Sequence, residues 1–160
     1  MSRLDSFIRR VSAQRDILNH VKEQALLPDQ GDILELGLGN GRTYSHLLEL
    51  FPERRIMVFE RAVMAHPSCI PADENLVLGE IEETGRKYVG NPAAMVHADI
   101  GDGSKETDEK ILQWLPQLMA DLLLPGGIAL SGLPQPNDNL QALPIPDGID
   151  PKRYFLYRKI

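Results

Sequence analysis

The 160-residue chain has a single cysteine, Cys69, a single tryptophan and only 6% aromatic residues. One cysteine excludes an intramolecular disulfide framework and is typical of a reducing compartment, so we expect a cytoplasmic protein. No apolar run approaches the ~20 residues that a membrane-spanning helix needs, and the N-terminus lacks the apolar stretch of a secretory signal. The sequence therefore predicts no association with a membrane.

Positive charge is also scarce, because 17 Lys and Arg stand against 23 Asp and Glu, which gives a formal net charge of −6. This balance argues against nonspecific binding to nucleic acid or to acidic membranes. The hydrophobic content of 42% and the charged content of 25% are ordinary for a globular protein. A chain of this length forms one domain with a substantial core, so we expect a single domain over residues 1–160.

Glycines at every second position follow an apolar segment in residues 33–43, ILELGLGNGRT. The pattern predicts a strand, a glycine turn and a helix over residues 43–51, an arrangement that holds a ligand between strand end and helix start. A dinucleotide site has the spacing G-x-G-x-x-G, but here Arg42 occupies the place of the third glycine. Glu35 at the end of the strand would repel a pyrophosphate, whereas it suits an ammonium or sulfonium cation.

The rest of the chain alternates predicted helices and strands. Apolar residues at three- and four-residue spacing predict a helix over residues 2–27, and apolar runs predict strands at 31–36, 55–60, 76–79, 93–100 and 128–130. Further helices are expected at 81–89 and 110–124, where Pro116 should kink the helix or mark its true start. Two prolines leave room for only a short helix in residues 61–71, and residues 132–160 predict a long loop, a short strand near 140–145 and a strand at 154–158.

The motif E-x-G-x-G-x-G at residues 35–41 resembles the first motif of the class I S-adenosylmethionine-dependent methyltransferases. Later features follow in the family's order across residues 31–130: Glu60 after the second strand, a Gly-Glu-Ile turn at 79–81, Asp99 after the fourth strand, and Pro-Gly-Gly at 125–127. The resemblance implies an α/β fold with a Rossmann-like, doubly wound, mainly parallel sheet. It also implies an added N-terminal helix over 1–28, a cofactor-binding core over 31–131 and a shortened C-terminal strand region over 132–160.

S-adenosylmethionine is the cofactor that this resemblance implies. The loop glycines would approach its methionine part, Glu35 would support its ammonium, and Glu60 would hold the ribose. Glu80 and Ile81 would flank the adenine. The expected cofactor contacts are Glu35, Gly37, Gly39, Asn40, Gly41, Thr43, Glu60, Arg61, Gly79, Glu80, Ile81, Asp99 and Ile100.

A methyl acceptor with a proton to lose needs a base near the methyl group. His97 and Asp99 lie at the exit of the fourth strand and are the candidate catalytic residues; for His97 the alternative is a buried, hydrogen-bonded strand histidine. No metal is expected, because His97 stands where the catechol-type enzymes begin their Asp-Ala-Asp. The Asn/Asp-Pro-Pro-Tyr signature of amino-methylating nucleic-acid enzymes is absent.

We therefore expect an enzyme that methylates a small molecule. Two alternatives remain open, a non-catalytic S-adenosylmethionine-binding or scaffold protein and a nucleotide-dependent oxidoreductase. The N-terminal helix either packs with a solvated polar face or caps the cofactor site. Its apolar stripe and a free terminal strand predict a homo-oligomer, either a dimer or a tetramer.

Overall fold

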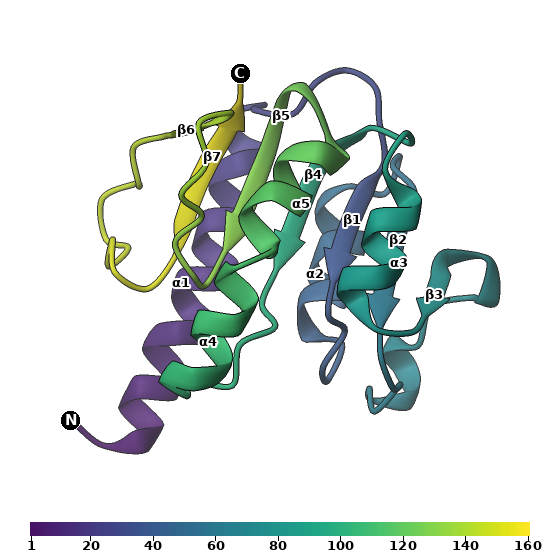
Figure 1. The fold of residues 1–160 in the computed structure, drawn as a ribbon. Coiled ribbons are helices and arrows are strands. Elements are labelled where there is room, and N and C mark those ends of the chain that lie inside the picture. The colour runs from purple at the N-terminus through teal and green to yellow at the C-terminus, as the bar shows by residue number, and fades with distance from the viewer.

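The computed structural model describes residues 1–160 and contains one seven-stranded sheet in the order β3-β2-β1-β4-β5-β7-β6 (Figure 1). The strands are β1 (Ile33–Leu36), β2 (Ile56–Glu60), β3 (Leu76–Leu78), β4 (Ala93–Ala98), β5 (Leu123–Ser131), β6 (Leu140–Ala142) and β7 (Phe155–Lys159). The first five strands are parallel, whereas β7 runs antiparallel to both β5 and β6. This topology confirms the expected mainly parallel, Rossmann-like α/β fold.

Helices cover both faces of the sheet, as a doubly wound fold requires. They are α1 (Arg3–Glu23), α2 (Arg42–Leu50), α3 (Ile81–Tyr88), α4 (Lys105–Leu112) and α5 (Leu115–Leu122). Residues of α1 and α2 join one buried cluster with Ile33, while residues of α4 and α5 join a second cluster with its neighbour Leu34. Burial on both faces explains why β1 and β4 are apolar along nearly their whole length. None of the helices combines the length and the apolar character that crossing a bilayer demands.

The first helix is five residues shorter than predicted, because it covers residues 3–23 rather than 2–27. It begins after a capping box, in which the Asp5 backbone N–H donates to Ser2 Oγ at 3.0 Å and the Ser2 N–H donates to Asp5 Oδ2 at 3.1 Å. It ends at Glu23 rather than at Leu27, because Ala25 adopts a left-handed conformation with φ of 49°. The prediction was wrong there since alanine gives no signal for a helix end.

Two other helix predictions need correction. The helix expected over residues 110–124 is two helices, α4 and α5, which separate at Gln113 and Trp114. Pro116 lies in the first turn of α5, where its missing N–H costs nothing, so it marks the start of that helix. Residues 61–71 contain a single 3₁₀ turn, Pro67–Cys69, instead of an α-helix.

The C-terminal region completes the sheet. The Pro-Gly-Gly segment at 125–127 lies inside β5 rather than before it, where the pairing with β4 shifts between Ala93–Leu123 and Met95–Ile128. No helix separates β5 from β6, as the shortened tail predicted. The terminal strand is not free, because β7 is paired on both sides.

Candidate functional site

The carboxyl ends of β1 and β4 lie side by side, since Leu36 pairs with Ala98. From this point the chain builds the sheet outward in both directions, which makes it the topological switch point where doubly wound sheets bind ligands. A cavity of about 380 Å³ opens here, and we name it the first cavity. It is lined by α1, by the glycine loop (residues 37–43) and by Asp99, which follows β4.

The three loop glycines have different structural roles. A Cβ on Gly37 would lie 2.5 Å from Ile100 Cγ2, and a Cβ on Gly41 would collide with the Cβ of Cys69. A Cβ on Gly39 would have no heavy atom within 4 Å. Two glycines are therefore required by packing, while Gly39, with φ of 52°, leaves its open side to the first cavity.

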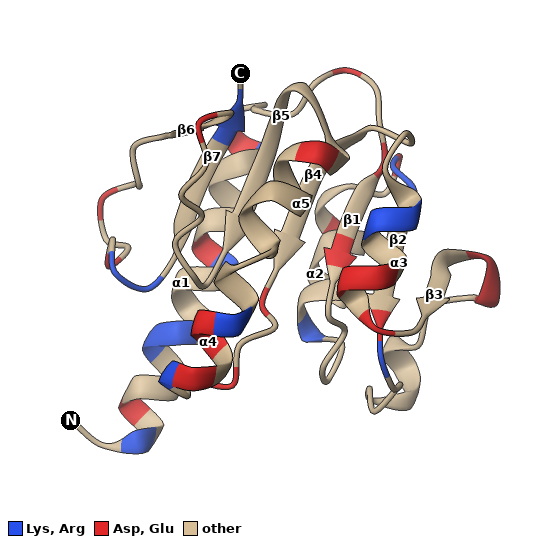
Figure 2. Ribbon diagram, in the orientation of Figure 1, with Lys and Arg blue, Asp and Glu red and all other residues tan.

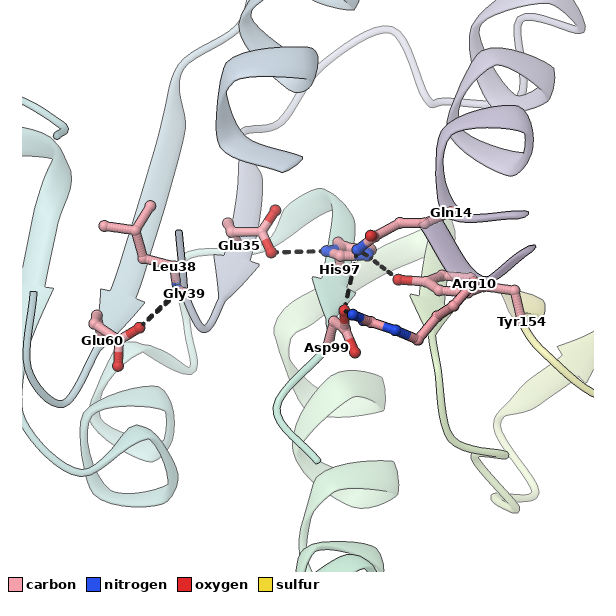
Figure 3. A network of polar contacts seen from close by, with 9 residues as sticks. All are labelled: Arg10, Gln14, Glu35, Leu38, Gly39, Glu60, His97, Asp99 and Tyr154. Carbon is pink, nitrogen blue, oxygen red and sulfur yellow. Dashed lines mark hydrogen bonds and ion pairs between the residues drawn. The ribbon is translucent and has the colours of Figure 1, made fainter. Parts of the chain in front are cut away.

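Glu60, at the end of β2, holds the glycine loop in place (Figure 3). Its Oε2 accepts hydrogen bonds from the backbone N–H groups of Leu38 at 2.7 Å and Gly39 at 3.1 Å. Its Oε1 accepts from the N–H of Arg61 at 2.7 Å. A carboxylate offers about four acceptor positions, so Oε1 retains capacity for another donor. The ribose contact expected for Glu60 stays a prediction, and ordering of the loop is an added role.

Glu35 is the buried acid of the first cavity. It is 1% exposed, and its Oε1 lies 2.7 Å from His97 Nδ1. Its Oε2 is buried and has no hydrogen-bond partner in the protein. Because an unpaired buried acceptor costs about 1–3 kcal/mol, and a charged one more, this oxygen is suited to a cation entering the cavity.

His97 stands at the centre of a buried polar network (Figure 3). Glu35 and His97 are register partners on β1 and β4, on the face of the sheet that α1 covers. The Nε2 of His97 makes a short hydrogen bond with the Tyr154 hydroxyl and lies 3.5 Å from Gln14 Nε2. His97 is fully buried and lines neither cavity, so its placement matches the alternative of a buried, hydrogen-bonded strand histidine.

Burial and neighbouring charge shift the acid–base behaviour of this network. Burial raises the pKa of Glu35, and the Asp99 carboxylate raises it further, although His97 opposes both effects. Burial alone would lower the pKa of His97, but the Glu35 and Asp99 carboxylates outweigh it and raise that pKa. Burial and the same two carboxylates raise the pKa of Tyr154 well above its ordinary value, which keeps its hydroxyl protonated.

Asp99 separates the first cavity from a second cavity of about 420 Å³, and it lines both. Its Oδ2 accepts hydrogen bonds from Gln14 Nε2 at 3.2 Å and Arg10 Nη1 at 3.3 Å. The second cavity lies beyond the ends of β4 and β5 and is lined also by Ile100, by Tyr154 and by residues of the loop before β7.

The remaining residues predicted to contact the cofactor lie in three places: the first cavity, the second cavity, and the ends of β2 and β3. Asn40 and Thr43 line the first cavity, and Ile100 lines the second. The other predicted contacts line neither cavity: Glu60, Arg61, Gly79, Glu80 and Ile81. They lie together at the ends of β2 and β3, where the Gly79 N–H donates to the Glu60 carbonyl at 3.1 Å.

Asp102, one of the acids that line the second cavity, is already engaged in local structure. Asp102 accepts hydrogen bonds from the Ser104 N–H at 2.8 Å and from Thr107 Oγ1 at 3.1 Å, at the start of α4. The structure contains no group of three or more His, Cys, Asp or Glu side chains that could hold a metal ion. The expectation of a metal-independent reaction stays a prediction.

Three residues of the network were not identified from the sequence: Arg10, Gln14 and Tyr154. Gln14 could have been found, because it occupies an apolar stripe position between Val11 and Leu18 and is buried in the structure. A polar residue inside such a stripe indicates a buried hydrogen-bond partner. Tyr154 gave no signal, since its contact with His97 joins residues 57 positions apart.

Comparison with known proteins agrees with this geometry. An S-adenosyl-L-methionine methyltransferase from Silicibacter pomeroyi DSS-3 is 39% identical over 99% of both chains, with a TM-score of 0.90. PaMTH1 from Podospora anserina, solved with S-adenosylhomocysteine, is 16% identical with a TM-score of 0.52, over 100% of this chain and 80% of that one. DesVI from Streptomyces venezuelae is 20% identical with a TM-score of 0.54, over 88% of this chain and 59% of that one. A search of curated proteins by sequence found no match.

The family comparison covers nearly the whole chain. Residues 1–159 match the family described as S-adenosyl-L-methionine methyltransferase. This match favours methyl transfer over the nucleotide-dependent oxidoreductase considered from the sequence. The chain therefore belongs to the S-adenosyl-L-methionine methyltransferase family and is an enzyme whose cofactor is S-adenosyl-L-methionine.

Proposed function

We propose that the protein transfers the methyl group of S-adenosylmethionine to a small molecule held in the second cavity. The observation that carries the proposal is the buried Oε2 of Glu35, which lacks a partner and belongs to a residue lining the first cavity. The cofactor, when bound, supplies a methyl group activated by a sulfonium. The protein's task is then to orient the two reactants and exclude water, and orientation alone can remove roughly 7–11 kcal/mol of barrier.

The first cavity suits the amino-acid part of the cofactor. Glu35 accepts from its ammonium, and Gly39 allows the close approach of its backbone. Arg15 and Arg42 line the same cavity, and a guanidinium is suited to the cofactor's carboxylate. From there the nucleoside extends across Glu60, which takes a ribose hydroxyl, toward Glu80 and Ile81 beside the adenine.

The second cavity suits a small acceptor. Its volume of about 420 Å³ falls within the ~300–1,000 Å³ range of small-molecule sites. It adjoins the first cavity at Asp99, so an acceptor there lies beside the end of the cofactor that carries the methyl group. Asp99 contacts both reactants and orients them. The net charge of −6 supports a small molecule over nucleic acid.

The same proposal includes a cytoplasmic homo-oligomer. The outer part of α1 supports self-association, because Leu4, Phe7 and Ile8 are 65%, 41% and 50% exposed. Light scattering coupled to size-exclusion chromatography tests it, and a monomer at micromolar concentration contradicts it.

The test of the proposed function is product formation. The purified protein is incubated with S-adenosylmethionine carrying a labelled methyl group and with fractions of a metabolite extract. Formation of S-adenosylhomocysteine together with a labelled small molecule supports the proposal, and a Glu35→Gln variant serves as the control for cofactor-dependent transfer. Binding of the cofactor without any product would favour the non-catalytic binder considered from the sequence.

A further inference from the structure

Three buried side chains form a continuous hydrogen-bonded line between the two cavities (Figure 3). Glu35 on β1 accepts from His97 Nδ1 at 2.7 Å, and His97 Nε2 on β4 meets the hydroxyl of Tyr154, just before β7. Glu35 lines the first cavity and Tyr154 lines the second. A buried polar line of this kind is costly to build, because each of its members is removed from water.

We propose that Tyr154, His97 and Glu35 form a proton relay, in which Tyr154 accepts the proton of the methyl acceptor while passing its own proton to His97. The inference rests on the proposed function, because it concerns an acceptor in the second cavity. Tyr154 is the catalytic residue that touches the acceptor. His97 and Glu35 act through it as positioning residues.

The hydrogen bonds define the direction of transfer. A carboxylate can only accept, so Nδ1 of His97 carries the proton that lies against Glu35. The Nε2 atom of a neutral His97 is then an acceptor, and the Tyr154 hydroxyl donates to it. The oxygen of Tyr154 keeps lone pairs for a donor from the acceptor molecule. Because the raised pKa of Tyr154 disfavours a free phenolate, the two proton movements occur together.

Atoms and charges balance in this scheme. The acceptor's proton goes to Tyr154 Oη, and the Tyr154 hydroxyl proton goes to His97 Nε2. The electron pair left on the acceptor forms the bond to the methyl carbon, and the pair of the broken carbon–sulfur bond remains on sulfur. The relay ends as an imidazolium on His97 opposite the Glu35 carboxylate. The proton leaves through the second cavity after the products depart, which restores neutral His97.

Binding of the cofactor prepares this relay. His97 contacts Glu35 from β1, Gln14 from α1, and Tyr154. The Asp99 carboxylate after β4 also acts on it, and Arg10 from α1 is paired with Asp99. Burial opposes charge on His97, but the two carboxylates raise its pKa and favour the imidazolium while the first cavity is without a cation. An ammonium at Glu35 Oε2 offsets the carboxylate's charge, so His97 releases its proton and becomes able to accept one.

The decisive variant is Tyr154→Phe, compared with Tyr157→Phe as the matched control. Tyr157 lies three positions further along the same segment, but it belongs to the other core cluster and its hydroxyl accepts from the Gln135 N–H at 2.9 Å. Proton transfer by a positioned group contributes roughly 10²–10⁴-fold, so Tyr154→Phe should lower kcat by about 100-fold or more. Its affinity for S-adenosylhomocysteine should remain within about twofold of wild type, and Tyr157→Phe should retain both properties.

Two measurements separate a relay from a merely structural role. The kcat of wild type should rise with pH as His97 becomes neutral. This pH dependence should be absent in His97→Gln, because glutamine keeps polar contacts but cannot take a proton. Independently of turnover, ¹⁵N NMR of the ring nitrogens should find His97 protonated at Nδ1, and its pKa should fall when S-adenosylhomocysteine binds. The His97→Gln spectrum assigns this residue among the 4 histidines.

The outcomes distinguish the relay from the proposed function. Wild-type protein that forms no product from any fraction overturns the proposed function. Wild-type turnover that Tyr154→Phe leaves equal to that of Tyr157→Phe overturns the relay alone. A His97 ring protonated only at Nε2, or one whose pKa does not respond to S-adenosylhomocysteine, also overturns it, whatever the activity.

Discussion

The two cavities on either side of Asp99 are built in different ways. The first is formed mainly by two continuous segments, the loop 37–43 and the helix α1 that lies against it. The second is assembled from four separated parts of the chain, residues 98–103, Asp108 with Leu115, residues 131–133 and residues 152–154, together with Arg10. The geometry of a cavity made from one loop and one helix depends on few contacts, whereas a cavity made from four parts of the chain depends on the whole C-terminal half. Substitutions should therefore separate cofactor affinity from turnover.

The largest effect on the first cavity is expected from Glu35→Gln. The variant keeps the size of the side chain and a hydrogen bond to His97 but removes the charge opposite the cofactor's ammonium. Removing one partner of a buried charged pair costs several kcal/mol, so affinity for S-adenosylhomocysteine should fall at least about 100-fold. Isothermal titration calorimetry measures this loss. Retained affinity would mean that the ammonium binds elsewhere.

A somewhat smaller loss is expected from Glu60→Ala, which lies outside both cavities. The substitution removes the acceptor of the Leu38 and Gly39 N–H groups as well as the predicted ribose contact. A charge-assisted hydrogen bond is worth about 1.5–3 kcal/mol, so cofactor affinity should weaken roughly ten- to a hundred-fold. Calorimetry with adenosine separates the loss of loop order from the loss of the ribose contact. If Glu60 only orders the loop, the substitution should leave adenosine affinity unchanged.

A matched pair of glycine substitutions tests the division between the cavities directly. The Cβ in Gly39→Ala points to open space at the first cavity, and the Cβ in Gly132→Ala lies in the second cavity, 3.3 Å from Asp99 Oδ1. Small displacements of reactants are costly, so each change should reduce its own function roughly tenfold. Gly39→Ala should weaken cofactor binding, while Gly132→Ala should lower kcat/KM for the acceptor. Equal effects of both on both readouts would contradict two separate sites.

The smallest effect concerns stability and pH. Burial opposes protonation of His97, but the Glu35 and Asp99 carboxylates raise its pKa, so the folded protein binds that proton more tightly than the unfolded chain. This stabilisation is complete below the unfolded pKa of about 6.5 and is lost as pH rises through the folded pKa. Chemical denaturation from about pH 6 to about pH 9 should therefore give a steeper fall in unfolding free energy for wild type than for His97→Gln. Parallel curves would mean that His97 does not titrate in this range.

Local patterns made much of the fold and the first cavity predictable. Four of the five parallel strands, β1, β2, β4 and β5, are largely buried apolar runs, whereas β3 is only partly buried. Acids and glycines next to these runs mark where the strands end. Glu35 and the glycine loop lie in one unbroken segment, so their proximity follows from the sequence. The end of α1 at Glu23 could not be predicted, because it depends on the backbone conformation of Ala25 rather than on residue type.

The second cavity could not be predicted for a different reason. Tyr154 reaches His97 across the β5–β7 pairing, and Arg10 reaches Asp99 from a helix 89 residues away in sequence. Such contacts are fixed by tertiary packing and leave no local pattern. His97 could be placed on its strand from the sequence, but whether its ring faced a cavity or the interior depended on what α1 and the segment before β7 brought to it.

The central claim is that the unpartnered oxygen of Glu35 binds the ammonium of the cofactor. Calorimetry tests this claim with two ligands, S-adenosylhomocysteine and 5′-methylthioadenosine, which lacks the amino-acid part. The affinity of each ligand is measured for wild type and for Glu35→Gln. The account predicts that the substitution weakens S-adenosylhomocysteine at least about 100-fold while it leaves 5′-methylthioadenosine within about twofold. Equal weakening of both ligands, or of neither, would contradict it.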